Sequence, residues 1–174
     1  NQYEVSDGRR VNRYDVTILV NGLPLVHIEL KRRGVSLREA FNQINRYGRE
    51  SFWAGCSLYE YVQIFIISNG TETKYYSSTT RGSCVDTRQR IHNSFEFTSY
   101  WADAKNMPIR DLEDFTATFL TRHSLLNILT RYCVLTEQKA LLVMRPYQIV
   151  ATEKLINQIE IAHNARTYGT RDAG

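Results

Sequence analysis

The sequence has few cysteines, and their spacing suits neither a disulfide framework nor a metal knuckle. Cys56, Cys84 and Cys133 are far apart, and their number is odd. Disulfide-stapled secreted domains normally carry an even set of cysteines, and structural zinc sites normally carry closely spaced pairs. We therefore expect a protein of a reducing compartment, the cytoplasm.

Long apolar runs and nucleotide-phosphate motifs are also missing. No run is long enough to span a bilayer, and the first residues lack the order of a signal peptide. The pattern Gly-x-x-x-x-Gly-Lys-Ser/Thr, which cradles nucleotide phosphates, does not occur. We expect a soluble chain without a membrane partner, unable to hydrolyse ATP by itself. Because Asn1-Gln2-Tyr3 resembles the middle of an element and has no initiator methionine, we also expect upstream sequence to be missing.

The composition is that of one globular domain with a basic balance. The chain has 174 residues, of which 43% are apolar and 11% aromatic, enough for a sizeable core. The formal net charge of +4 permits a polyanionic partner, although many ordinary domains are as basic.

Two alternating segments near the N-terminus predict a β-hairpin. Residues 13–20 and 24–31 alternate apolar and polar side chains on either side of Asn21-Gly22. One apolar face should hold Tyr14, Val16, Ile18 and Val20, and the other face should bring Arg13, Asp15 and Thr17 beside His27, Glu29 and Lys31. A two-residue turn would separate Asp15 from Glu29, so an odd-length connection or a bulge is expected.

A helix is predicted from about Leu37 to Phe52. Ser36 followed by Glu39 has the form of a capping box. Gln43 and Tyr47 share one flank, four residues apart. The buried stripe is expected to contain Leu37, Ala40, Phe41 and Ile44, and the outer side Arg38, Arg46 and Arg49.

The rest of the chain predicts an α/β fold with a mixed central sheet flanked by helices. Strands are expected over residues 61–67, 73–77 and 94–101, and a polar loop over 79–93. Two helices are expected between residues 109 and 133, with Ser124 capping the second. Residues 141–144 suit a short strand or linker, and Pro146 suits the start of a final helix reaching about His163.

The polar hairpin face has the residue types that phosphodiester hydrolysis needs. A metal ion neutralises phosphate charge and lowers the pKa of an attacking water, and Mg²⁺ prefers a few carboxylate oxygens plus waters. Asp15 and Glu29 supply carboxylates, and Lys31 projects from the same face to orient the water or stabilise developing charge. The alternative is that these side chains are only the solvated face of the hairpin.

In this order, Asp15, Glu29-Leu-Lys31 and Gln43-x-x-x-Tyr47 resemble the PD-(D/E)xK nuclease superfamily, in its RecB-like and type I restriction branches. The similarity to the R subunit (the motor and endonuclease subunit) of type I restriction enzymes is closer still. It is carried by residues 12–26, 27–31, 38–44, 67–71, 114–119 and 143–148.

The resemblance implies a PD-(D/E)xK core in which Asp15 and Glu29 bind Mg²⁺ and Lys31 assists the attack. Gln43 and Tyr47 would position the catalytic groups or the DNA backbone. For these two residues, the alternative is a helix flank hydrogen-bonded to the sheet. Contacts with DNA are expected from Arg13, Arg46 and Arg49.

The resemblance also implies the organisation of a longer protein. Residues 1–140 would be an endonuclease domain lacking its N-terminal part, and residues 141–174 a linker and the start of a superfamily 2 helicase motor. Arg145 and Gln148 resemble the adenine-reading Q motif of that motor, although an ordinary helix start explains them equally well. Double-stranded DNA and the methylase and specificity subunits would be the partners. ATP would act in the full-length subunit, and S-adenosylmethionine only through the methylase.

Two other functions are compatible with the sequence. One is a stand-alone PD-(D/E)xK nuclease of repair or recombination, against which the segment Arg145-Pro-Tyr-Gln148 argues. The other is a catalytically silent module for DNA binding or subunit assembly, against which the intact Asp15, Glu29, Lys31 and Gln43 argue.

Overall fold

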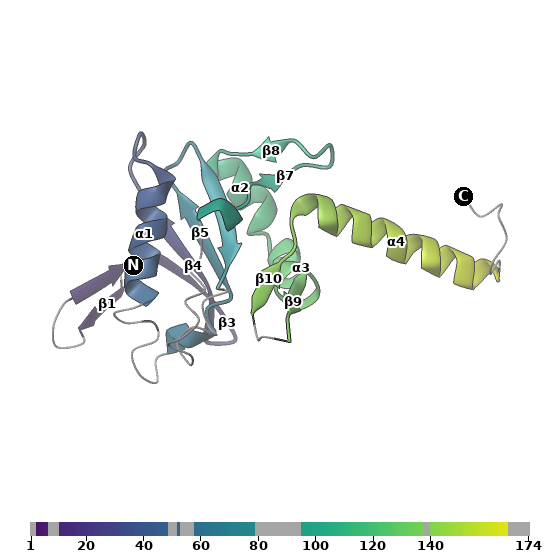
Figure 1. Ribbon diagram of the computed structural model, residues 1–174, viewed down its shortest axis with the longest axis horizontal. Coiled ribbons are helices and arrows are strands. Elements are labelled where there is room, and N and C mark those ends of the chain that lie inside the picture. The colour runs from purple at the N-terminus through teal and green to yellow at the C-terminus, as the bar shows by residue number, and fades with distance from the viewer. Residues whose placement is uncertain are drawn as a thin grey trace.

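A mixed four-stranded sheet forms the centre of the molecule. The computed structural model describes residues 3–6, 11–48, 52, 58–78, 95–137 and 140–166 (Figure 1). The sheet has the strand order β3-β4-β5-β6. β4 and β5 run parallel, and the two outer pairs run antiparallel, which confirms the predicted mixed sheet. Its strands are β3 (Val16–Val20), β4 (Leu23–Leu30), β5 (Ile64–Ser68) and β6 (Thr73–Ser77).

The hairpin of β3 and β4 contains the predicted irregularity. Thr17 pairs with His27 and Ile18 with Val26, and the register shifts between Ile18 and Leu19. The shift keeps the polar positions of the two strands on one face of the sheet, as the side-chain parity required.

The prediction that Tyr14 shares the face of Val16 and Ile18 is wrong. The chain bends at Asp15, between β2 (Val11–Tyr14), which pairs with β1 (Tyr3–Ser6), and β3. The bend interrupts the period-two alternation. Tyr14 therefore packs against Tyr47 and Phe52, with ring centroids 5.0 and 4.9 Å away, while Val16 is 41% exposed.

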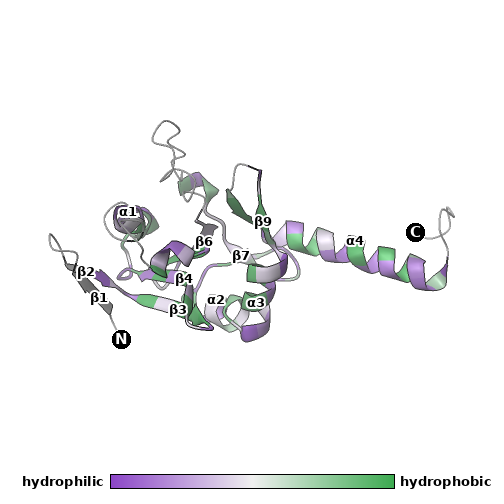
Figure 2. Cartoon of the chain, turned by 90° about the horizontal axis from the view of Figure 1, so that it is seen from below, coloured by the Kyte–Doolittle hydropathy of each residue, from purple (hydrophilic) through white to green (hydrophobic). Residues whose placement is uncertain are grey.

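Helices cover both faces of the sheet, so the protein has two apolar cores. On one side lies α1 (Leu37–Tyr47), and on the other lie α2 (Leu112–Phe119) and α3 (Arg122–Arg131) (Figures 1 and 2). Phe65 and Ile67 of β5 point into the α1 core, whereas Ile64 and Ile66 point into the α2–α3 core. A strand buried on both faces explains why β5 is a continuous apolar run.

The helix α1 matches its predicted buried stripe, and Tyr47 joins that stripe. Its N-cap is Ser36, whose hydroxyl accepts from the backbone N–H of Arg38 at 3.3 Å rather than from Glu39 as a capping box requires. The α-helix ends at Tyr47, with Gly48 as its C-cap. Residues 49–51 of the predicted extension to Phe52, and the whole predicted loop over 79–93, lie outside the described residues.

The two helices expected between residues 109 and 133 are present, but their caps differ from the prediction. Asp111 caps α2 by accepting from Glu113 N at 2.8 Å. Thr121, not Ser124, caps α3, because the Thr121 hydroxyl accepts from Ser124 N at 3.2 Å. Ser124 therefore lies inside the first turn, and the helix starts earlier than expected.

The strand predicted over residues 94–101 is wrong. Phe95–Phe97 form a short 3₁₀ helix, named η4, and the hydroxyl and the backbone N–H of Thr98 both donate to the Phe95 carbonyl. This local hydrogen bonding closes a turn in place of a ladder. Only Ser99 makes an isolated bridge, to Tyr75, before β7 (Trp101–Ala102) pairs with β8 (Pro108–Ile109). Another 3₁₀ helix, Leu58–Tyr61, precedes β5 where the strand was expected to begin.

The C-terminal part ends in a hairpin and a long helix that extends away from the sheet (Figure 1). β9 (Cys133–Leu135) pairs with β10 (Leu141–Val143), and α4 (Pro146–Ala165) follows, as expected from residue 141 onward. The Tyr75 hydroxyl donates to the Met144 carbonyl at 3.0 Å, tying this segment to β6. A domain boundary at residue 140 stays a prediction. Among the described helices, none has the length and apolarity to cross a membrane.

Candidate functional site

The carboxyl end of β4 carries a buried acid and a lysine that contact each other. Glu29 is fully buried, whereas the side chain of Lys31 is 19% exposed, and Lys31 Nζ lies 2.9 Å from Glu29 Oε1. The backbone N–H of Lys31 donates to Ser68 O at 2.8 Å, which continues the parallel pairing with β5. A carboxylate removed from water in this way is not part of a solvated face, so that alternative fails for Glu29.

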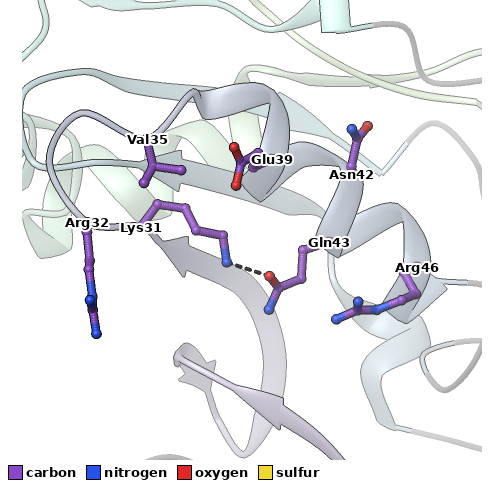
Figure 3. Close-up of a pocket in the computed structure, with 7 residues that line it drawn as sticks. All are labelled: Lys31, Arg32, Val35, Glu39, Asn42, Gln43 and Arg46. Atoms are coloured by element: carbon purple, nitrogen blue, oxygen red, sulfur yellow. Dashed lines mark hydrogen bonds between the residues drawn. The ribbon is translucent and has the colours of Figure 1, made fainter.

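From Lys31 a chain of hydrogen bonds runs to the helix α1. Lys31 Nζ donates to Gln43 Oε1, as the dashed line in Figure 3 marks, and Gln43 Nε2 donates to the Tyr47 hydroxyl. Tyr47 in turn donates to the Arg13 carbonyl at 2.7 Å. The spacing of Gln43 and Tyr47 by one helical turn allows both to face the sheet. The helix flank predicted from the sequence, Gln43 and Tyr47, is therefore hydrogen-bonded to the end of β4 through Lys31.

Asp15 joins this group from the bend before β3. Its Oδ2 accepts from the backbone N–H of Leu30, between Glu29 and Lys31, at 2.9 Å. Burial raises the pKa of the Tyr47 phenol, the Gln43 hydrogen bond lowers it in part, and the charges of Glu29 and Asp15 raise it further. Asp15, Glu29, Lys31, Gln43 and Tyr47 are thus brought together, and their catalytic role stays a prediction.

The inner side of Glu29 faces polar groups that have no hydrogen-bond partner. Among the described residues, the buried side-chain nitrogen and oxygen atoms without one are His27 Nε2, Glu29 Oε2 and the Tyr76 hydroxyl. His27 Nε2 is 3.7 Å from Glu29 Oε2. Burial raises the pKa of Tyr76 far above its usual value, and the charge of Glu29 adds to the effect. Neither His27 nor Tyr76 was assigned a role from sequence. Because side chains alternate along β4, the sequence predicted that His27 and Glu29 share one face of the strand. The position of Tyr76 depends instead on the order of the strands in the sheet.

The donor atoms suit a hard cation only in part. Within the part of the chain that the structure describes, no group of three or more His, Cys, Asp or Glu side chains gathers as a metal site. Asp15 and Glu29 nevertheless supply two carboxylates, and Glu29 Oε2 is buried without a hydrogen-bond partner. Because Mg²⁺ usually keeps several waters and takes one or two carboxylates, the donor types of these two residues fit it, and waters would have to supply the remaining ligands.

An open pocket of about 490 Å³ lies beside the Lys31–Gln43 contact. Arg32 and Arg46 border it on either side in Figure 3, and both are exposed. Arg46 also places its guanidinium 5.6 Å from the Tyr47 ring centroid. Arg13 is exposed as well, while Arg49 lies outside the described residues. Three cations, Lys31, Arg32 and Arg46, and one carboxylate, Glu39, thus line the pocket.

Arg145 and Gln148 lie at the start of α4, far along the chain from this pocket. Gln148 Oε1 accepts from the backbone N–H of Arg145 at 2.8 Å, which is a helix-capping contact. Arg145 also lines a second pocket, of about 370 Å³, together with Trp101 and Tyr147. The capping contact accounts for Gln148 structurally, and its nucleotide-binding role stays a prediction.

Comparison with known proteins decides the family. Residues 1–83 match the family described as the type I restriction enzyme R protein N terminus. The chain is 57% identical over 153 residues to the type I restriction enzyme EcoprrI endonuclease subunit of Escherichia coli, a match that covers 88% of this chain. Residues 1–83 belong to this N-terminal family, and the chain as a whole is similar to type I restriction enzyme endonuclease subunits.

Two further relatives are also described as type I restriction enzyme endonuclease subunits. A type I restriction enzyme endonuclease subunit of Staphylococcus saprophyticus is 43% identical over 176 residues, covering 100% of this chain. A putative one of Methanocaldococcus jannaschii is 33% identical over 85 residues, covering 46% of this chain. The chain spans 46% of the Escherichia coli relative, 17% of the staphylococcal one and 8% of the archaeal one. It corresponds to the N-terminal region of an R protein.

Proposed function

We propose that this region is the Mg²⁺-dependent nuclease centre of a type I restriction enzyme and that it cleaves double-stranded DNA. The observation that carries the proposal is the single hydrogen-bonded chain from buried Glu29 through Lys31 and Gln43 to Tyr47, with Asp15 held on the intervening backbone. The order of these residues is that of a PD-(D/E)xK core. A surface hairpin would not need to bury an acid and pair it with a lysine.

We propose a role for each of these side chains. Asp15 and Glu29 would hold Mg²⁺, which when bound supplies charge neutralisation and a more acidic water. Lys31, fixed between Glu29 and Gln43, would present its ammonium group to the attacked phosphate. Gln43 and Tyr47 hold that lysine in place, since their hydrogen bonds end on the Arg13 backbone. Arg13, Arg46 and Arg49 would contact the DNA backbone.

In the whole R protein, cleavage would be coupled to ATP-dependent translocation. Methylase and specificity subunits would be the partners that supply sequence recognition, and S-adenosylmethionine would bind only the methylase. Arg145 and Gln148 would contact ATP within the complete motor. These statements rest on the similarity to the R protein family. They concern the longer protein, because ATP hydrolysis and the contacts with partner subunits belong to the complete R protein.

The test uses the complete R protein assembled with its methylase and specificity subunits. Glu29→Gln keeps the size of the side chain and removes the charge, so plasmid cleavage in Mg²⁺ is expected to fall at least about a hundredfold while ATP hydrolysis persists. Asp15→Asn should behave alike. Glu113→Gln, at an exposed position of α2, is the matched control and should cleave normally. Cleavage retained in both site variants would contradict the proposal and leave an assembly module as the function.

A further inference from the structure

A row of cations and aromatic rings crosses the surface beyond the candidate nuclease pocket. Phe95 contacts two cations, with Arg38 Cζ and Lys74 Nζ each 4.8 Å from its ring centroid. Lys74 Nζ is also 4.7 Å from the Tyr100 centroid, and Arg110 Cζ is 5.3 Å from the same ring. We call these five side chains the cation–aromatic ladder. It joins α1, η4, β6 and the segment before α2, which are far apart in sequence.

The ladder is fixed by polar contacts at its far end. The Tyr100 hydroxyl donates to Glu72 Oε1 at 2.9 Å, and Arg110 lies 4.0 Å from the same oxygen. Glu72 is itself placed by the turn, since its backbone N–H donates to Asn69 Oδ1 at 2.8 Å. Side chains already held in place lose less conformational entropy when a ligand binds. The ladder and Glu72 together hold three cations and one carboxylate, so this group of side chains carries a net positive charge.

We infer that the cation–aromatic ladder binds the sugar-phosphate backbone of double-stranded DNA. Arg38 is exposed and Arg110 has a side chain that is 60% exposed, so both can reach phosphates. Each of the Phe95 and Tyr100 rings already contacts two of the chain's own cations, which compete with unpaired bases for stacking on these rings. Phosphate contact is therefore favoured over base stacking.

The position of the ladder extends the candidate site. Arg38 precedes Glu39, which lines the pocket with Lys31 and Arg32. A duplex whose scissile phosphate lies at Lys31 would thus find further cations along the surface from Arg38 towards Arg110. The inference rests on the proposed function in one respect, namely that the substrate is duplex DNA. It assigns DNA-binding roles to Arg38, Lys74 and Arg110, outside the proposed catalytic group.

The test measures the salt dependence of binding to a non-specific duplex by the complete R protein. The double variant Arg38→Gln/Arg110→Gln should bind more weakly, and the slope of log affinity against log salt should shrink by about 0.9 for each phosphate that the variant no longer neutralises. The control Arg122→Gln/Lys154→Gln removes the same charge from exposed positions on α3 and α4 and should keep the wild-type slope. Unchanged thermal unfolding would show that the ladder variant remains folded.

Two results would overturn the inference. One is a ladder variant with the slope of its control, and the other is a loss of affinity confined to single-stranded DNA, which would assign the rings to base stacking. A normal duplex slope with loss of binding to the methylase or specificity subunit would instead make the ladder a protein interface. Glu29→Gln separates the two proposals, because normal cleavage by that variant refutes the nuclease centre and leaves the ladder result untouched.

Discussion

The two carboxylate oxygens of Glu29 differ in their contacts. Its Oε1 accepts from Lys31, while its Oε2 faces His27 and has no hydrogen-bond partner. Removing a carboxylate from water is costly, and an ion pair with one lysine offsets only part of that cost. The contacts of the described residues therefore offset the cost of burying Glu29 only in part.

Burial of the uncharged Tyr76 hydroxyl also has a desolvation cost, and this cost leads to a prediction about stability. Its hydroxyl is buried and has no hydrogen-bond partner, so Tyr76→Phe should raise the free energy of unfolding by roughly 1 kcal/mol. The measurement is chemical unfolding of the chain. Tyr75→Phe is the matched control, since the Tyr75 hydroxyl donates to Met144 O and its loss should destabilise by about 1 kcal/mol. A loss of stability in Tyr76→Phe would mean that a bound water or ligand satisfies the hydroxyl.

At the scale of elements, the turn between β5 and β6 connects the sheet to α1. Asn69 Oδ1 accepts from the backbone N–H groups of Thr71 and Glu72 and from the Thr71 hydroxyl. Its Nδ2 donates to the Val35 carbonyl at 2.8 Å, just before the helix. Gly70 completes the turn at φ +89°, a conformation that other residues rarely adopt. The turn thereby fixes where α1 begins relative to Lys31.

Asn69→Ala should consequently destabilise the chain by roughly 3 kcal/mol, because it leaves two backbone N–H groups and the Val35 carbonyl without their partner. Thermal or denaturant unfolding measures this. Asn42→Ala is a suitable control, since Asn42 is exposed on α1 and alanine is the better helix former. Equal stability of the two variants would show that the turn does not depend on the Asn69 side chain.

Local patterns predicted the hairpin, its bulge and the buried stripe of α1, because each depends on a fixed period of two or 3.6 residues. The same reasoning failed at Tyr14, where a bend at Asp15 resets the alternation, and at Thr121, which caps α3 one turn ahead of the predicted Ser124. It placed His27 beside Glu29 by parity. It found neither Tyr76 nor the ladder, since both result from strand order and long-range packing rather than from spacing.

At the scale of the whole molecule, the described residues form two cores on a shared sheet, and buried phenols contribute to both. Tyr47 and Tyr76 belong to the α1 core, and Tyr75 belongs to the α2–α3 core. Burial raises the pKa of all three above the ordinary 10.0. Burial also raises the pKa of the Cys133 thiol from 9.0 to about 11. In each case the folded state favours the neutral form, so the two cores should respond to alkali together.

Stability should therefore fall in alkaline solution. A phenol whose pKa is higher in the folded state contributes its full stability below pH 10.0, the ordinary value, and loses it as the pH rises toward the folded pKa. Beyond pH 10.0, each fully buried tyrosine should lower the free energy of unfolding by about 1.4 kcal/mol per pH unit. Denaturant unfolding at a series of pH values measures the slope, and tyrosinate absorbance reports ionisation. The double variant Tyr75→Phe/Tyr76→Phe should have a shallower slope than wild type. If its slope is the same, ionisation of these two phenols is not what unfolds the cores, and deprotonation elsewhere must be responsible.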